Sequence, residues 1–286
     1  MDLYDYNTIK RILTRHGFTF SKALGQNFLI DPSVCPRMAA ALEADDRTGV
    51  LEIGPGIGVL TKELSAVCGR VAAVELDRRL WPVLEETMAG CENFTLVQGD
   101  VMQQDLAALV REHFGGLRPI LCANLPYNIT TPLLTRVVES RCFDSVTVLI
   151  QKEAAQRFTA PQGSPEIGAF PLQLQYRMET ELLFDVEPEC FLPRPKVTST
   201  VLRCVRRQRP AVAVRDEALF QKVLKGAFLL RRKTLSNSLA SALPGFSKEE
   251  VQAAIQACGL PATVRGEALS LAEFAALTEV LAEARG

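Results

Sequence analysis

The feature that most constrains the fold is a regular alternation of short apolar runs with helical segments over the first half of the chain. Parallel strands need a crossover connection, usually a helix, and their sheets are buried on both faces. The alternation therefore predicts an α/β protein with a Rossmann-like parallel sheet. The predicted strands are 50–53, 71–75, 94–97, 120–123 and 145–150, and the predicted helices are 59–67, 78–88, 106–113 and 132–139.

The pattern of predicted strands and helices changes beyond Pro188. Residues 197–205 form one more strand candidate, and the pattern is helical from Asp216 onward. A chain of 286 residues is also close to the size at which single cores divide. We therefore predict a sheet domain over residues 1–210, with 1–30 as an N-terminal extension, and a smaller all-helical domain over residues 211–286.

Composition narrows the class of protein. Hydrophobic residues make up 48% and charged residues 23%, which excludes wholesale disorder. No uninterrupted apolar stretch reaches the length of about 18 residues that a transmembrane helix needs, and the first five residues are acidic where a signal peptide is basic. We expect an intracellular, cytoplasmic protein without a membrane partner. The eight cysteines form no CxxC pair and only two histidines are present, so we expect neither a metal site nor a disulfide framework.

Charge is concentrated in one part of the chain. The net charge is −1, yet residues 194–233 carry twelve Lys or Arg against Asp216 and Glu217, a local net charge of +10. Such a block predicts a face that binds a polyanion. A solvated charged surface is the alternative. The run Arg231-Arg232-Lys233 begins or precedes a predicted helix, where cations can bind phosphates without reading sequence.

A glycine turn follows the first predicted strand. Glycines stand at 54, 56 and 58, whereas a dinucleotide fingerprint requires the third glycine at 59, which is Val59. A dehydrogenase is therefore disfavoured. Glycine lets the backbone approach a ligand closely, although a nucleotide-type fold with a tight turn would explain the same residues.

Two carboxylates end the next two strands. Glu75 can accept hydrogen bonds from both ribose hydroxyls of a ligand, and Asp100 can reach an adenine amino group. Ligands of open α/β sheets bind at the carboxyl edge, where these strand ends meet. The set predicts an adenosyl ligand without a diphosphate.

The fourth strand ends in Asn124-Leu125-Pro126-Tyr127. Proline keeps Leu125 extended, so the Asn124 amide oxygen and the Leu125 carbonyl can face the same point as two neutral acceptors. They suit an exocyclic NH₂ group, and Tyr127 offers a stacking face. A strand-end turn with a capping Asn and a core Tyr is the alternative.

These motifs, with several others, resemble the small-subunit ribosomal RNA adenine dimethyltransferases (the KsgA type) nearly end to end. The resemblance covers the blocks 24–31, 52–58, 75, 99–100, 124–127, 151–157, 191–197 and 231–235. It implies that S-adenosylmethionine contacts Asn27, Leu29, Gly54, Gly56, Glu75, Asp100 and Asn124. It also implies Asn124, Leu125, Tyr127 and Phe191 as catalytic positions, with Tyr127 and Phe191 stacking the target base, and Arg194, Lys196, Arg231, Arg232 and Lys233 as RNA contacts. For Phe191, a core phenylalanine beside Pro193 is the alternative.

The resemblance implies an enzyme that dimethylates N⁶ of two adjacent adenosines near the 3′ end of 16S ribosomal RNA, in the assembling small subunit. We expect a monomer. A large-subunit adenine methyltransferase of the antibiotic-resistance type and a non-catalytic assembly factor remain as alternatives. One segment departs from the family pattern: Ile167-Gly168-Ala169-Phe170-Pro171 stands where a Tyr-Gly pair and a Ser-Val helix start are usual.

Overall fold

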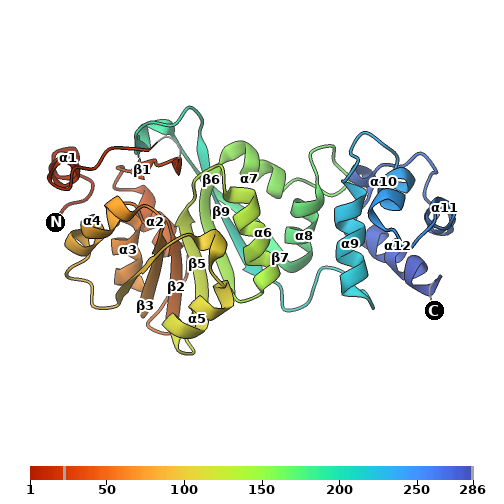
Figure 1. The fold of residues 1–286 in the computed structure, drawn as a ribbon, viewed down its shortest axis with the longest axis horizontal. Coiled ribbons are helices and arrows are strands. Elements are labelled where there is room, and N and C mark those ends of the chain that lie inside the picture. Colours follow the sequence, from red (N-terminus) through yellow and green to blue (C-terminus); the bar gives the residue numbers. More distant parts are fainter. Residues whose placement is uncertain (22–23, 285–286) are drawn as a thin grey trace. The chain divides into compact units, whose positions relative to one another are not determined.

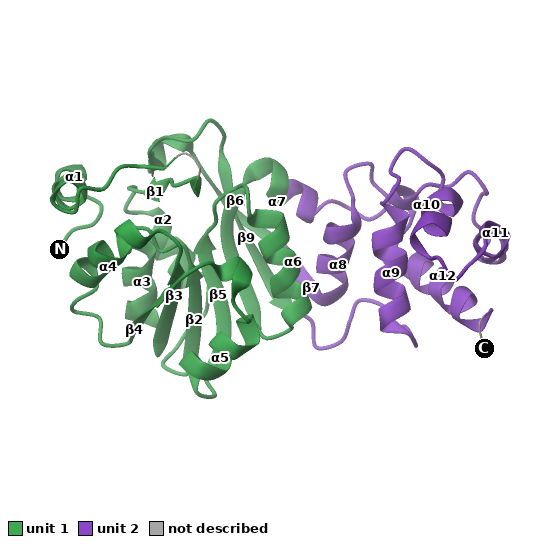
Figure 2. Cartoon of the chain, in the orientation of Figure 1, with its two compact units in different colours: residues 1–155, 181–206 green, residues 156–180, 207–286 purple. Residues whose placement is uncertain are grey.

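The computed structural model describes residues 1–21 and 24–284, so residues 22–23 of the predicted extension and 285–286 of the predicted helical domain lie outside it. Two compact units divide the chain (Figure 2): unit 1 comprises residues 1–155 and 181–206, and unit 2 comprises residues 156–180 and 207–286. Among the described residues, no helix has the length and apolar character needed to cross a membrane.

Unit 1 is built on a seven-stranded sheet of order β4-β3-β2-β5-β6-β9-β7 (Figure 1). The strands are β2 (Thr48–Ile53), β3 (Arg70–Glu75), β4 (Phe94–Gln98), β5 (Arg118–Asn124), β6 (Ser145–Gln151), β7 (Met178–Val186) and β9 (Ser199–Arg206). The run β4-β3-β2-β5-β6 is parallel throughout, which confirms the predicted α/β class. All six residues of β2 are buried, as expected for a central strand covered on both faces.

The sheet is not wholly parallel, because β9 pairs antiparallel with β6, with Gln151 opposite Ser199. The chain reaches β9 from β7 through the 3₁₀ turn Pro188–Cys190 and β8 (Phe191–Leu192), and β9 begins opposite the end of β6, so β6 and β9 run in opposite directions. The sequence analysis also missed β7, whose only consecutive apolar residues, Leu182-Leu183-Phe184, stand among acidic residues.

The helices that connect the parallel strands are α3 (Val59–Val67), α4 (Trp81–Thr87), α5 (Leu106–Phe114) and α6 (Thr130–Ser140). Helix α2 (Val34–Ala40) precedes the first of these strands, and α7 (Lys152–Phe158) follows the last. The predicted helix over 78–88 is a short 3₁₀ turn, Arg78–Leu80, followed by α4, which starts with Pro82 in its first turn. The other predicted helices differ from the observed ones by no more than a few residues at their ends.

The N-terminal extension is anchored to the sheet domain at both of its ends. Helix α1 (Tyr6–Arg15) is followed by His16, whose Nε2 lies 2.7 Å from Glu86 Oε2 on α4. Strand β1 (Phe28–Leu29) pairs antiparallel with β8 (Phe191–Leu192). Between them, Gln26 Nε2 donates to Asp77 Oδ2 at 2.8 Å. The extension is thus part of unit 1 rather than an appendage.

Unit 2 is helical, with α8 (Ala169–Arg177), α9 (Glu217–Ala227), α10 (Leu235–Ala242), α11 (Lys248–Ala257) and α12 (Leu271–Glu283). Helix α8 lies before the boundary predicted at residue 210, yet it belongs to this unit. Its Tyr176 ring packs 4.9 Å from that of Phe220, and Leu172 is buried in the same cluster. Helix α8 joins unit 2 because these apolar side chains complete the core around α9.

The unusual segment 167–171 lies at the start of α8. Ile167 is fully buried in the core of unit 2, and Gly168 precedes the first turn of the helix. The departure from the family pattern therefore falls on a core position of unit 2.

Candidate active site

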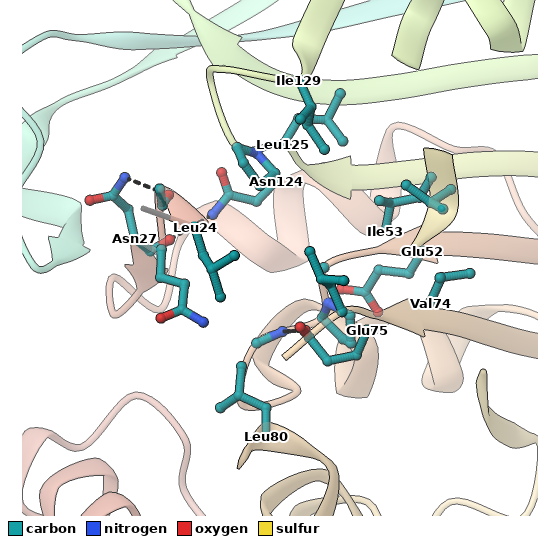
Figure 3. A pocket seen from close by; sticks show the side chains of 18 of the residues that line it. Leu24, Asn27, Glu52, Ile53, Val74, Glu75, Leu80, Asn124, Leu125 and Ile129 are labelled. Carbon is teal, nitrogen blue, oxygen red and sulfur yellow. Dashed lines mark hydrogen bonds between the residues drawn. The ribbon is translucent and has the colours of Figure 1, made fainter. Parts of the chain in front are cut away.

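One pocket of unit 1, of about 230 Å³, collects the ends of four neighbouring strands (Figure 3). The residues that follow β2, β3 and β4 and those that end or follow β5 line it, together with residues 24–29 of the extension. Backbone hydrogen bonds continue the ladder past the strand ends, from Gly54 N to Val74 O at 2.9 Å and from Gly99 N to Glu75 O at 2.9 Å. The turns are therefore held in register by the sheet itself.

The structure brings together all the residues that the sequence analysis assigned to the methyl donor. Tyr127 and Leu125 line the same pocket, whereas Phe191 does not. The donor set that lines it is Asn27, Leu29, Gly54, Gly56, Glu75, Asp100 and Asn124.

The glycine turn requires glycine for two different reasons. Gly54 has φ +67° with open space where a Cβ would lie, so its conformation is what excludes other residues. Gly56 has φ +62°, and a Cβ there would lie 3.0 Å from the Phe28 ring, which is closer than an ordinary contact. The turn leaves open space for a ligand beside Gly54.

Glu75 is tied to this turn. Its side chain is 5% exposed, and its two oxygens accept from Asp77 N at 2.7 Å and from Gly56 N at 3.3 Å. Burial raises the pKa of Glu75 to about 7, against the lowering effect of those two hydrogen bonds. A ligand that offers hydroxyl donors here would stabilise the ionised carboxylate.

Glu52 is a pocket residue that sequence analysis missed. It lies on β2, is 1% exposed, and its Oε2 has no hydrogen-bond partner among the described residues. Burial, with a contribution from the charge of the neighbouring Glu75, raises the pKa of Glu52 to about 8. The signal in the sequence is one acid inside the apolar run Val50-Leu51-Glu52-Ile53.

Asp100 follows β4 and caps the short 3₁₀ turn Val101–Gln103. Its Oδ1 accepts from Met102 N at 2.8 Å, and its Oδ2 accepts from Gln103 Nε2 at 3.2 Å. These bonds give Asp100 a structural role and fix the direction of its carboxylate in the pocket wall.

Asn124 is held by the N-terminal extension. Its Nδ2 donates to the backbone oxygen of Asn27 at 2.9 Å, across 97 residues of sequence. Within residues 1–21 and 24–284, no donor reaches Asn124 Oδ1 or the Leu125 carbonyl oxygen. Two neutral acceptors without a donor therefore stand on consecutive residues that line the pocket.

The two aromatic candidates differ in their surroundings. Tyr127 is half-buried in the pocket wall, where its Oη lies 2.8 Å from Ser199 Oγ, and burial raises its pKa. Phe191 is 3% exposed and packs in the core of unit 1, opposite Leu29 in the β1–β8 pair. This burial matches the alternative of a core phenylalanine, and the stacking role of Phe191 stays a prediction.

The basic block is divided between the two units. Several of its arginines form ion pairs within their own unit, with Arg203 on Glu43 at 3.0 Å and Arg207 on Glu179 at 3.0 Å, while Arg206 pairs with Asp144. Of the predicted RNA contacts in unit 1, Arg194 lies 3.2 Å from Glu189, and Lys196 is exposed. The local net charge therefore overstates the cations that are free to bind a polyanion.

The run 231–233 is a turn directly before α10, as predicted. Arg231 Nη2 donates to Pro165 O at 3.3 Å, so this side chain also holds a loop of unit 2. Arg232 and Lys233 are exposed, and no carboxylate of the described residues lies within 4.0 Å of either. They are available cations in unit 2.

Comparison with known proteins shows which family the chain resembles. The family described as "Ribosomal RNA adenine dimethylase" matches residues 17–283. Relatives from Streptococcus pneumoniae named "Ribosomal RNA small subunit methyltransferase A" are 43% identical over 285 residues, which cover 98% of this chain and 98% of each relative.

Two solved structures share the fold. The 23S rRNA methyltransferase ErmE is 25% identical with a TM-score of 0.67, over 89% of this chain and 99% of its own. A dimethyladenosine transferase from Plasmodium falciparum is 20% identical with a TM-score of 0.74, over 87% of this chain and 95% of its own. Both structures therefore match most of this chain and nearly all of their own.

The raised pKa of Glu52 predicts a pH-dependent stability. The folded chain holds this proton more tightly than the unfolded chain, so ionisation opposes folding as the pH rises from 4.5 to about 8. Glu52→Gln cannot ionise, and we expect it to lose less stability over this range, by on the order of 1–3 kcal/mol. Urea unfolding at pH 5 and pH 8 measures the difference, with the exposed Glu181→Gln as control. An equal pH dependence of the free energy of unfolding in Glu52→Gln and wild type would contradict the raised pKa of Glu52.

Proposed function

The chain belongs to the ribosomal RNA adenine dimethylase family, and we propose on this premise that its substrate is two adjacent adenosines near the 3′ end of 16S ribosomal RNA. It is a ribosomal RNA adenine methyltransferase. We propose that each adenosine receives two methyl groups at N⁶ from S-adenosylmethionine. The observation that carries the proposal is the pair of free acceptors, Asn124 Oδ1 and Leu125 O, on the wall of a pocket that also holds Glu75 and Asp100.

The pocket fits an adenosyl donor. The open space beside Gly54 admits a ligand close to the backbone, and Glu75 offers acceptor oxygens for two ribose hydroxyls. Asp100 offers an acceptor for an adenine amino group. The unpartnered Oε2 of Glu52 is a further polar atom that a polar group of the ligand or water would satisfy. When bound, S-adenosylmethionine supplies a methyl group on a sulfonium that is already activated for transfer.

The protein's contribution to the chemistry is orientation. The lone pair of an adenine amino group is delocalised into the ring, which makes the nitrogen a poor nucleophile. Hydrogen bonds from NH₂ to Asn124 Oδ1 and Leu125 O favour a pyramidal nitrogen and fix where its lone pair points. Orientation of this kind can lower a barrier by roughly 7–11 kcal/mol in favourable cases.

The anchor of Asn124 decides which end of its amide faces the base. Because Nδ2 donates to Asn27 O, the acceptor Oδ1 is the end left for the substrate. Neither acceptor is a strong base, so we assign no general base, and the proton leaves to solvent after transfer. Asn27 is thereby a positioning residue as well as part of the donor pocket.

The target base must leave its stack to enter the pocket, which costs a few kcal/mol. Tyr127 offers one face on which the base stacks, and Ser199 holds its hydroxyl at 2.8 Å. Arg232 and Lys233 of unit 2 then contact RNA phosphates and set the register of the substrate. We propose that the RNA is presented in an assembling small ribosomal subunit, in the cytoplasm, to a monomeric enzyme.

Two other functions are alternatives to the proposed one. A large-subunit methyltransferase has support from the 25% identity to ErmE, but the identity to the small-subunit relatives is 43% over a larger share of the chain. A non-catalytic assembly factor has no need for the anchored Asn124 or for a donor pocket with Glu75 and Asp100 intact.

One assay separates these functions. Purified small and large ribosomal subunits that lack the modification are incubated with the enzyme and methyl-labelled S-adenosylmethionine. We expect label in dimethyladenosine of small-subunit RNA only. Label in large subunits would support the resistance-type enzyme, and binding to small subunits without label would support the assembly factor.

Glu75→Ala tests the donor pocket. Two ribose hydroxyls lose a charged acceptor, and hydrogen bonds to charged groups contribute about 1.5–3 kcal/mol. We expect calorimetry to show weaker S-adenosylmethionine binding by that amount, and an intermediate loss for Glu75→Gln. Glu85→Ala, an exposed acid on α4, is the control. Unchanged donor affinity in Glu75→Ala would remove this residue from the site.

Asn124→Ala tests chemistry against binding. The variant loses the acceptor that orients the amino group, whereas other residues make the proposed phosphate contacts. We expect the single-turnover rate at saturating donor to fall at least about tenfold while affinity for small subunits stays within about twofold. A rate within about threefold of wild type, under 1 kcal/mol, would contradict the orienting role.

Arg232→Ala combined with Lys233→Ala tests the basic turn. Each phosphate contact steepens the dependence of log K on log salt by about 0.7–0.9, so the double variant should flatten the slope by up to about 1.4–1.8. Arg231 is left in place because it also binds the Pro165 carbonyl. Donor affinity should not change.

The control for this experiment is Lys248→Ala, which removes an exposed cation on α11 beside Glu249 and Glu250. An unchanged slope in the double variant would mean that RNA binds elsewhere on the molecule.

A further inference from the structure

Two neighbouring leucines are exposed in the turn between α9 and α10. Leu229 is 58% exposed and Leu230 is 39% exposed. In the part of unit 2 that the structure describes, no other large apolar side chain is as exposed, and elsewhere in the chain the exposed ones are isolated in sequence. Single exposed apolar residues need no explanation, but an adjacent pair on one turn is a small apolar patch.

The turn that carries this leucine pair is well hydrogen-bonded. Leu229 N donates to Gly226 O at 3.2 Å, and Leu230 N donates to Ser238 Oγ at 3.0 Å. Ser238 Oγ itself donates to Gly226 O at 2.6 Å, and Lys233 N donates to Leu230 O at 2.8 Å. The leucines are therefore presented by fixed backbone, and their exposure does not come from a loose loop.

The leucine pair is followed, after Arg231, by the free cations Arg232 and Lys233 of the same turn. Arg232 and Lys233 have no carboxylate of the described residues within 4.0 Å, so the turn is an apolar patch beside uncompensated positive charge. An anionic partner with apolar faces complements such a surface. RNA has both features within one nucleotide, since its phosphates are anionic and an unstacked base or ribose presents an apolar face.

A second copy of the chain fits this surface less well. Two leucines offer far less than the roughly 800 Å² per partner of a standard interface, and a two-fold contact would bring the cations of both copies together.

We propose that Leu229 and Leu230 form an apolar RNA contact, on which an unstacked base or ribose of ribosomal RNA packs while neighbouring phosphates bind Arg232 and Lys233. The inference rests on the proposed function and adds a contact of a different physical kind. Cation–phosphate contacts release counterions and weaken with salt, whereas burial of apolar surface does not. The leucine pair thus contributes affinity that persists at high salt.

The test compares salt dependences in the full-length protein. Binding to purified small subunits is measured across a salt series for wild type and for the double variant Leu229→Gln with Leu230→Gln. We expect the double variant to bind about tenfold more weakly at every salt concentration, with an unchanged slope. Arg232→Ala with Lys233→Ala should show the opposite behaviour, a flatter slope and a loss that shrinks as salt rises.

Matched variants keep the test decisive. Leu182→Gln replaces another exposed leucine, on β7, and should bind as wild type does. Leu229→Gln alone changes the more exposed position, so it should retain wild-type stability and show part of the loss. Donor affinity, measured by calorimetry, should be equal in all these variants.

Three outcomes would overturn the inference. Wild-type affinity in both leucine variants would mean that the patch lies outside the RNA contact. A flattened salt slope in the leucine variants would mean that they act through the cations. A wild-type dimer in sedimentation, absent in the leucine variants, would assign the patch to a second copy of the chain. If wild type methylates small subunits and any of these holds, only the inference fails. If wild type neither binds nor methylates them, the proposed function fails with it.

Discussion

The register of the parallel strands is the constraint on which the active site depends. Strand β2 pairs with β3 on one side and β5 on the other, and this places the ends of the strands at one edge of the sheet. Hydrogen bonds from Gly54 N and Gly99 N to the neighbouring strands extend that register into the turns. A shift of one residue in any of these pairs would move a pocket residue to the opposite face.

The same burial that holds the sheet together makes its acids costly. Glu52 and Glu75 lie in an apolar interior, where each is driven toward its protonated form. Glu75 recovers part of the cost through the backbone donors of Gly56 and Asp77, and a bound ribose would recover more. Glu52 Oε2 has no partner among the described residues, so its protonation couples the pocket to the stability of unit 1. Burial of these two acids lowers the stability of unit 1 and supplies the pocket with polar atoms for a ligand.

The pocket and the basic turn before α10 belong to two units with their own cores. Unit 1 holds the anchored Asn124 and the donor pocket, and unit 2 carries the turn with Arg232 and Lys233. Helix α8 shows how the division arises, because Tyr176 packs on Phe220 although the two are far apart in sequence. Ion pairs within each unit occupy several arginines of the basic block, which leaves fewer cations free to bind a polyanion.

The sequence by itself determined what depends on local pattern. Apolar runs and helical spacing predicted the five parallel strands and most helices, and the residues that end those strands had to meet at one edge, so Gly54, Glu75, Asp100 and Asn124 were found without a structure. Only tertiary structure decided what depends on distant partners. The hydrogen bond from Asn124 to Asn27 spans 97 residues, and the β1–β8 pairing joins the first segment of unit 1 to its second. The place of α8 in unit 2 and the pairing of Arg203 with Glu43 are of the same kind. No local pattern encodes these contacts, because each depends on which surfaces the packed sheet and helices leave facing one another.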